Sequence, residues 1–255
     1  MSTLDTEQIN IDLLREDIRK PIKTFASQLV NDMAENLKSI SVVGSALTED
    51  FHPRRSDINT VVVVERESHT LLKTLAGYGN QMGKLRLKAP LLMTNEFIQQ
   101  SLDVFGVEYL EYQFNHVTVY GQDPFDGLCF NKENVRLQCE RELRSIQIQL
   151  RQGYIRGLGQ YKIVGQLLVA CGRKLLPLFR AMLWLMDIDR SKETRTMLEL
   201  AGMGFGFDEK LMGTLLSLRK QEERLGPDLV DLMFQDVYKI VIHLCGLVDK
   251  LRTNI

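Results

Sequence analysis

The sequence feature that most constrains this chain lies between residues 39 and 65, where two apolar runs rich in valine flank a polar turn. The first run ends at Val43, directly before Gly44-Ser45, and the second covers residues 61–64. Short runs of β-branched residues bounded by turn residues are typical of buried strands. We therefore predict two adjoining strands, with a glycine corner after the first facing an acid, Asp57, at the start of the second.

The residues at this corner suit the binding of phosphate. Gly44 has no Cβ, so the backbone can turn sharply there and approach a ligand closely. The neighbouring N–H groups and the Ser45 hydroxyl can then hold phosphate oxygens. Asp57 and Asn59 are two residues apart on a predicted strand, so their side chains leave the same face. A pair of carboxylates at such positions would hold magnesium against a nucleoside triphosphate.

The order of these residues resembles a known signature. Gly44-Ser45, a gap of eleven residues, and then Asp57-Ile58-Asn59 before an apolar run are similar to the Gly-Ser plus Asp-x-Asp signature of the nucleotidyltransferase superfamily, which includes polymerase β-like enzymes and antibiotic nucleotidyltransferases. The run His116-Val-Thr-Val-Tyr-Gly-Gln-Asp-Pro looks like the end of such a domain in bacterial members. The resemblance implies an α+β fold, with a nucleotidyltransferase-like mixed sheet and flanking helices over residues 1–126. An all-α helical bundle over residues 127–255 would follow.

The resemblance also implies an activity, the transfer of a nucleoside monophosphate from a nucleoside triphosphate to an acceptor of unknown identity, with Mg²⁺ as cofactor. Gly44 and Ser45 would hold the phosphates, Asp57 would be the main metal ligand, and Asn59 would offer a neutral oxygen. Arg54 and Arg55 precede Asp57, where they either pair with triphosphate oxygens or form a solvated turn.

The chain departs from the family pattern at its acids. Position 59 is the second metal-binding acid in the family and is Asn59 here, while the strand predicted over residues 84–94, where a third acid usually projects, carries three basic residues and no acid. Glu108 and Glu111 lie in a second predicted β-segment, residues 108–120, and are the acids there that can replace a missing ligand. Because they are three apart, at most one would face Asp57 from a regular strand, and we take Glu108 as the candidate metal ligand. The alternative for each is a solvent-facing acid.

Two functions therefore remain open from the sequence. The first is nucleotidyl transfer through a degraded metal site that weakens or abolishes catalysis, since carboxylates in such a site offset the charge of the metals and position the attacking oxygen. The second is a non-catalytic nucleotide-binding or regulatory protein, or a scaffold that dimerises through its helical domain. The retained Gly44-Ser45 and Asp57 favour the first function, and the missing acids favour the second.

Helical periodicity replaces strand patterns from residue 135 onward. We predict helices near residues 135–155, 160–187, 208–224 and after Pro227, with a short one after Ser191. The run 175–186 is nearly apolar all round except for Arg180, so it should lie either at the centre of the bundle or against another copy of the chain. A homodimer is therefore a possible partner arrangement.

Composition limits the other partners. The net charge of −1 gives no support for bulk nucleic-acid binding or for binding an anionic membrane. The four cysteines lack metal-type or disulfide-type spacing, and the polar N-terminus lacks the apolar core of a signal peptide. We therefore expect reduced thiols, no membrane span and a cytoplasmic location.

Overall fold

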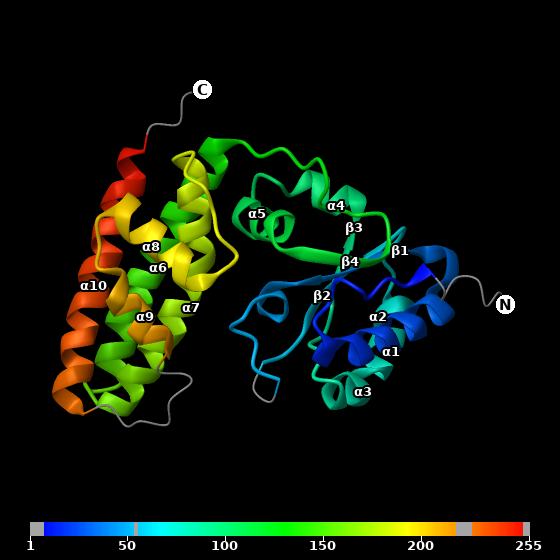
Figure 1. The fold of residues 1–255 in the computed structure, drawn as a ribbon, viewed down its shortest axis with the longest axis horizontal. Coiled ribbons are helices and arrows are strands. Elements are labelled where there is room, and N and C mark those ends of the chain that lie inside the picture. The colour runs from blue at the N-terminus through cyan, green and yellow to red at the C-terminus, as the bar shows by residue number, and fades with distance from the viewer. Residues whose placement is uncertain (1–7, 54–55, 218–225, 252–255) are drawn as a thin grey trace. The chain divides into compact units, whose positions relative to one another are not determined.

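A computed structural model of the chain describes residues 8–53, 56–217 and 226–251, and these residues form two compact units (Figure 1). The first unit, here called the sheet unit, extends to Leu102 and resumes with Tyr109–Cys129. The second, here called the helical unit, takes Asp103–Glu108 and the described residues from Phe130 on. The chain therefore leaves the sheet unit and returns to it before the helical unit is completed.

The sheet unit is built on a mixed sheet whose strand order is β3-β2-β1-β4. Its strands are β1 (Leu37–Val43), β2 (Asn59–Val64), β3 (Leu91–Thr94) and β4 (His116–Gly121). The central strand β1 is antiparallel to both β2 and β4, while β3 runs parallel to β2. In this register Val43, the last residue of β1, lies opposite Asn59 on one side and His116 on the other. The strands predicted around residues 40–43, 61–64 and 117–120 are confirmed.

One face of the sheet is covered by the long helix α1 (Glu16–Met33) together with α2 (His69–Gly77) and α3 (Gly79–Lys84), which Figure 1 shows on the same side. Ile22, Phe25 and Leu29 of α1 are buried in one core with the alternate sheet residues Ile40 and Val42. The start of α2 is fixed by a cap, because the Ser68 hydroxyl accepts a hydrogen bond of 3.1 Å from the backbone N–H of Leu71. This core holds β1 and β2 in a fixed register.

The predicted strand over residues 84–94 is wrong in its first part. Residues Gly79–Lys84 form helix α3, and β3 begins only at Leu91. Before β3, the predicted strand pairs through an isolated parallel bridge between Leu87 and Ile58. Buried Met82 packs in the core, so tertiary contact outweighs the low helix propensity of glycine.

The β-segment predicted over residues 108–120 is wrong in its first part, because Gly106–Phe114 form helix α5. The segment is rich in valine, tyrosine and phenylalanine, which pack well on a pleated surface and so suggested β-structure. Val107 and Leu110, however, are three residues apart and both are buried, which is the spacing of one helix face. Glu108 and Glu111 consequently share one side of a helix, contrary to the opposite sides that a strand would give them.

Among the residues that the structure describes, the helical unit contains five further helices, which confirm the predicted helical second half. They are α6 (Lys132–Arg156), α7 (Tyr161–Leu185), α8 (Thr194–Phe205), α9 (Glu209–Ser217) and α10 (Pro227–Lys250). The long helices α6, α7 and α10 pack against one another, and α7 also contacts α8 and α9. In the apolar run of α7, Leu175, Phe179 and Met182 are fully buried, and the Arg180 Nε donates to the Ser191 carbonyl oxygen at 3.3 Å. This run is therefore covered within the chain, and the reason given for a homodimer no longer applies.

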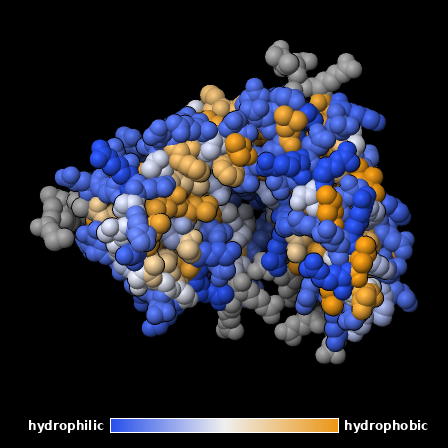
Figure 2. All heavy atoms as spheres, turned by 180° about the vertical axis from the view of Figure 1, so that it is seen from behind, coloured by the Kyte–Doolittle hydropathy of each residue, from blue (hydrophilic) through white to orange (hydrophobic). Residues whose placement is uncertain are grey.

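The apolar side chains that remain exposed are dispersed. Leu158, Met203 and Ile155 are among the most exposed of the large hydrophobic residues that the structure describes. On the face drawn in Figure 2, hydrophobic residues form separate groups among hydrophilic ones. Among the helices of the described residues, none combines the length and the hydrophobicity that crossing a membrane requires.

Candidate phosphate-binding site

The glycine corner forms at the end of β1, where Gly44 has a φ of +76°. This left-handed conformation is costly for residues with a Cβ, which explains the choice of glycine. A Cβ added at Gly44 would lie 3.5 Å from the side-chain nitrogen of Asn59, so the corner and the first residue of β2 are close neighbours. Gly44 and Asn59, predicted as site residues, are therefore brought together by the structure.

Ser45 follows in a short 3-10 turn, Gly44–Leu47, and is exposed. The backbone N–H and the hydroxyl of Thr48 both donate to the Ser45 carbonyl oxygen at 3.1 Å, and Ala46 is buried beneath the turn. The Arg15 Nη1 donates to the Thr48 carbonyl oxygen at 3.1 Å, a support that the sequence did not suggest. The turn is thus fixed on its inner side and leaves the Ser45 side chain accessible to a ligand.

Asp57 lies directly before β2, at the end of the sheet where β1 finishes. Its neighbour Ile58 is buried in the core under α1, so alternation along the strand places Asp57 and Asn59 on the opposite face. The side chain of Asp57 is 47% exposed and can therefore meet a ligand from solvent. Buried Ser56 holds the preceding turn, because its hydroxyl accepts a hydrogen bond of 3.1 Å from the His52 N–H.

A lysine stands beside this acid. The backbone N–H of Lys88 donates to the Ile58 carbonyl oxygen at 3.0 Å, and the Ile58 N–H donates to the Arg86 carbonyl oxygen at 2.8 Å. These bonds bring the Lys88 Nζ to 4.0 Å from the Asp57 Oδ2. The sequence revealed the basic residues of this segment but gave no sign of the pairing, because it depends on the contact between Ile58 and Leu87.

The other predicted ligands belong to the helical unit or lie outside the described residues. Glu108 is in α5, and its carboxylate accepts a hydrogen bond of 2.6 Å from the Gln138 Nε2 within the helical unit. Arg54 and Arg55, predicted to pair with triphosphate oxygens, lie outside the residues that the structure describes. On the strand next to the corner, His116 contacts the Tyr112 carbonyl oxygen through Nδ1 at 2.7 Å and Asp123 through Nε2 at 2.8 Å. These contacts fix the start of β4.

The residues at the corner do not fit a magnesium ion. Magnesium is normally held by carboxylates together with substrate phosphates. Here Asp57 supplies a carboxylate and Asn59 an amide, and the ammonium of Lys88 stands 4.0 Å from that carboxylate, where it opposes a divalent cation. Within the described parts of the chain, no three His, Cys, Asp or Glu side chains form a group that could hold a metal.

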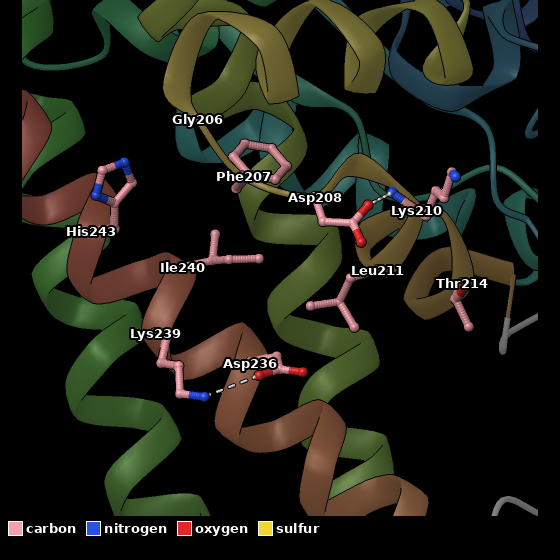
Figure 3. A pocket seen from close by; sticks show the side chains of 10 residues that line it. All are labelled: Gly206, Phe207, Asp208, Lys210, Leu211, Thr214, Asp236, Lys239, Ile240 and His243. Carbon is pink, nitrogen blue, oxygen red and sulfur yellow. Dashed lines mark hydrogen bonds and ion pairs between the residues drawn. The ribbon is translucent and has the colours of Figure 1, made fainter.

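The helical unit has a pocket of its own, of about 490 Å³, between the loop after α8 and helices α9 and α10 (Figure 3). Several of its polar groups already have partners: the Lys239 Nζ contacts Asp236 at 3.2 Å, and the His243 Nε2 contacts the Phe205 carbonyl oxygen at 2.7 Å. Apolar side chains of Phe207, Leu211 and Ile240 also line the pocket. This lining suits an apolar group better than a phosphate.

Comparison with known proteins bears on the fold. A scan against models of protein families and a search of curated proteins each gave no match. Among solved structures, the chain is similar to the spectinomycin adenyltransferase AAD(9) from Enterococcus faecialis, solved with ATP and spectinomycin, with a TM-score of 0.56 and 11% sequence identity. The similarity covers 91% of this chain and 99% of that one. The predicted fold class, a nucleotidyltransferase-like mixed sheet followed by a helical domain, is therefore confirmed.

Proposed function

We propose that the sheet unit binds a nucleoside triphosphate at the corner formed by Gly44, Ser45 and Asn59. The left-handed Gly44 next to Asn59, at the end of the sheet where Asp57 also lies, is the observation that carries this proposal. Similarity in fold to an adenyltransferase that was solved with ATP supports it.

Each residue has a defined part in this binding. The backbone N–H groups after Gly44 and the hydroxyl of exposed Ser45 donate to phosphate oxygens. The amide of Asn59 adds a neutral donor from β2. Phosphate recognition by several donors in this way does not require a reaction to follow.

Binding without efficient transfer is the function that the residues support best. In the family that the sequence resembles, carboxylates offset the charge of the metal ions during nucleotidyl transfer, and removing such groups costs orders of magnitude in rate. Asp57 is the remaining acid of the Asp-x-Asp pattern, and Lys88 stands beside it. We therefore regard the chain as a nucleotide-binding or regulatory protein on a nucleotidyltransferase fold.

Slow nucleotidyl transfer to an unknown acceptor is the second candidate. It is favoured by the extent of the structural similarity, which spans 91% of the chain and so includes helical as well as sheet residues. The similar protein acts as a spectinomycin adenyltransferase, so spectinomycin is a reasonable first acceptor to try.

Calorimetric titration with ATP and with adenosine tests the binding. We expect ATP to bind more tightly than adenosine, because the corner recognises phosphate, and Ser45→Ala to weaken ATP binding by about tenfold through the loss of one donor to a charged group. Equal affinity for the two compounds, or no binding of ATP, would contradict the proposal. Incubation with spectinomycin and ATP labelled at the α-phosphate then separates the two candidates, since labelled spectinomycin appears only if transfer occurs.

A further inference from the structure

We infer that Lys88 is the fixed cation of this site and that the chain binds nucleoside triphosphate without magnesium. This inference rests on the proposed nucleotide binding at the Gly44 corner. It concerns a different question, namely which positive charge neutralises the phosphates.

Backbone hydrogen bonding determines where Lys88 lies. Its N–H bonds to the Ile58 carbonyl oxygen at 3.0 Å, in the parallel bridge that joins this segment to the start of β2. The Nζ atom then lies 4.0 Å from the Asp57 Oδ2. A lysine ammonium is therefore held at the acid that would be the main ligand of a metal ion in the resembling family.

An ammonium at this place has two effects of opposite sign. It lowers the affinity of Asp57 for a divalent cation, because like charges repel across a short distance. It also attracts a triphosphate, to which its three N–H groups can donate. The Lys88 side chain is 60% exposed, so a ligand can reach it beside Asp57.

The neighbouring residue strengthens the positive charge of the segment. Arg86 and Lys88 flank Leu87, whose side chain is buried in the core. The Nε of Arg86 is buried and has no hydrogen-bond partner among the described residues. Two basic residues thus lie on the segment where the family that the sequence resembles usually has its third acid. A metal site needs negative charge at this place, and here the charge is positive.

Titration of the full chain with ATP, in magnesium chloride and in EDTA, tests the inference. We expect the dissociation constant of the natural protein to change by less than about twofold between the two buffers. Lys88→Met should weaken ATP binding in EDTA by about tenfold, the effect of losing one charge-assisted bond. Lys88→Arg keeps the charge and should bind ATP as the natural protein does.

Lys73→Met is the matched control, because it removes one exposed charge from α2, which packs on the core at the other face of the sheet. Binding of ATP that disappears in EDTA, or equal binding by Lys88→Met and the natural protein in EDTA, would overturn the role of Lys88 and leave the proposed nucleotide binding intact. Absence of ATP binding in both buffers would overturn both.

Discussion

At the scale of single residues, Gly44 carries the most information. Its φ of +76° makes it unlike the helical Gly77, at the end of α2, around which a Cβ would have open space. Because a Cβ would meet no tight contact at either position, comparing the two glycines isolates the cost of backbone strain at Gly44.

We expect Gly44→Ala to lower the free energy of unfolding by about 1–2 kcal/mol, the cost of a left-handed residue with a Cβ. The same substitution should weaken ATP binding, since the methyl group would stand beside Asn59 at the corner. Gly77→Ala should leave both quantities unchanged or raise stability slightly. Urea unfolding and calorimetry measure the two effects, and equal stability of the two variants would contradict the assigned strain.

At the scale of elements, α5 depends on a contact far along the chain. The Gln138 side chain of α6, which is 4% exposed, accepts a hydrogen bond of 2.9 Å from the Val107 N–H and donates one of 2.6 Å to Glu108. Both bonds lie within the helical unit and fix the first turn of α5 to α6.

Gln138→Ala should therefore cost about 1–3 kcal/mol of stability, because it leaves a backbone donor and a carboxylate without these partners. Gln152→Ala, at an exposed position of the same helix, should change stability by less than about 0.5 kcal/mol. Urea unfolding followed by circular dichroism compares the two. A small effect at Gln138 would mean that water replaces the lost bonds.

Local signals explain which elements could be predicted from the sequence. Val61 and its neighbours form a strand because the run is apolar and β-branched, and Ser68 begins α2 because its hydroxyl can cap a helix. The segment that became α5 has the composition of a strand, and its helix is stabilised by Gln138, which no local pattern reveals. The phosphate corner was likewise visible in Gly44 and Asp57, whereas the position of Lys88 follows from the pairing of Ile58 with Leu87.

At the scale of the whole molecule, the four cysteines differ in environment. All four are free, as the sequence suggested; Cys129 is exposed, while Cys139, Cys171 and Cys245 are buried. Burial raises the pKa of the Cys139 thiol to about 12, and that of the Cys171 thiol also to about 12, because the interior disfavours the thiolate. The reactive form of these thiols is therefore scarce near neutral pH.

We predict that Ellman's reagent at pH 8 titrates Cys129 rapidly and the three buried thiols slowly, and that all four react in urea. The raised pKa values of the buried thiols also make the stability of the fold depend on pH. The folded state holds these protons up to about pH 12 and the unfolded state up to about pH 9, so their stabilising contribution is complete below pH 9 and falls as the pH rises from 9 to 12. Rapid reaction of more than one thiol in the folded protein would contradict this burial.

The backbone passes between the two units at residues 102–103, 108–109 and 129–130. A single recombination junction after residue 102 would separate the sheet unit from its segment 109–129. A single junction after residue 129 would separate the helical unit from its segment 103–108. We therefore expect the sheet unit and the helical unit to be inherited together and not to be exchanged singly between proteins.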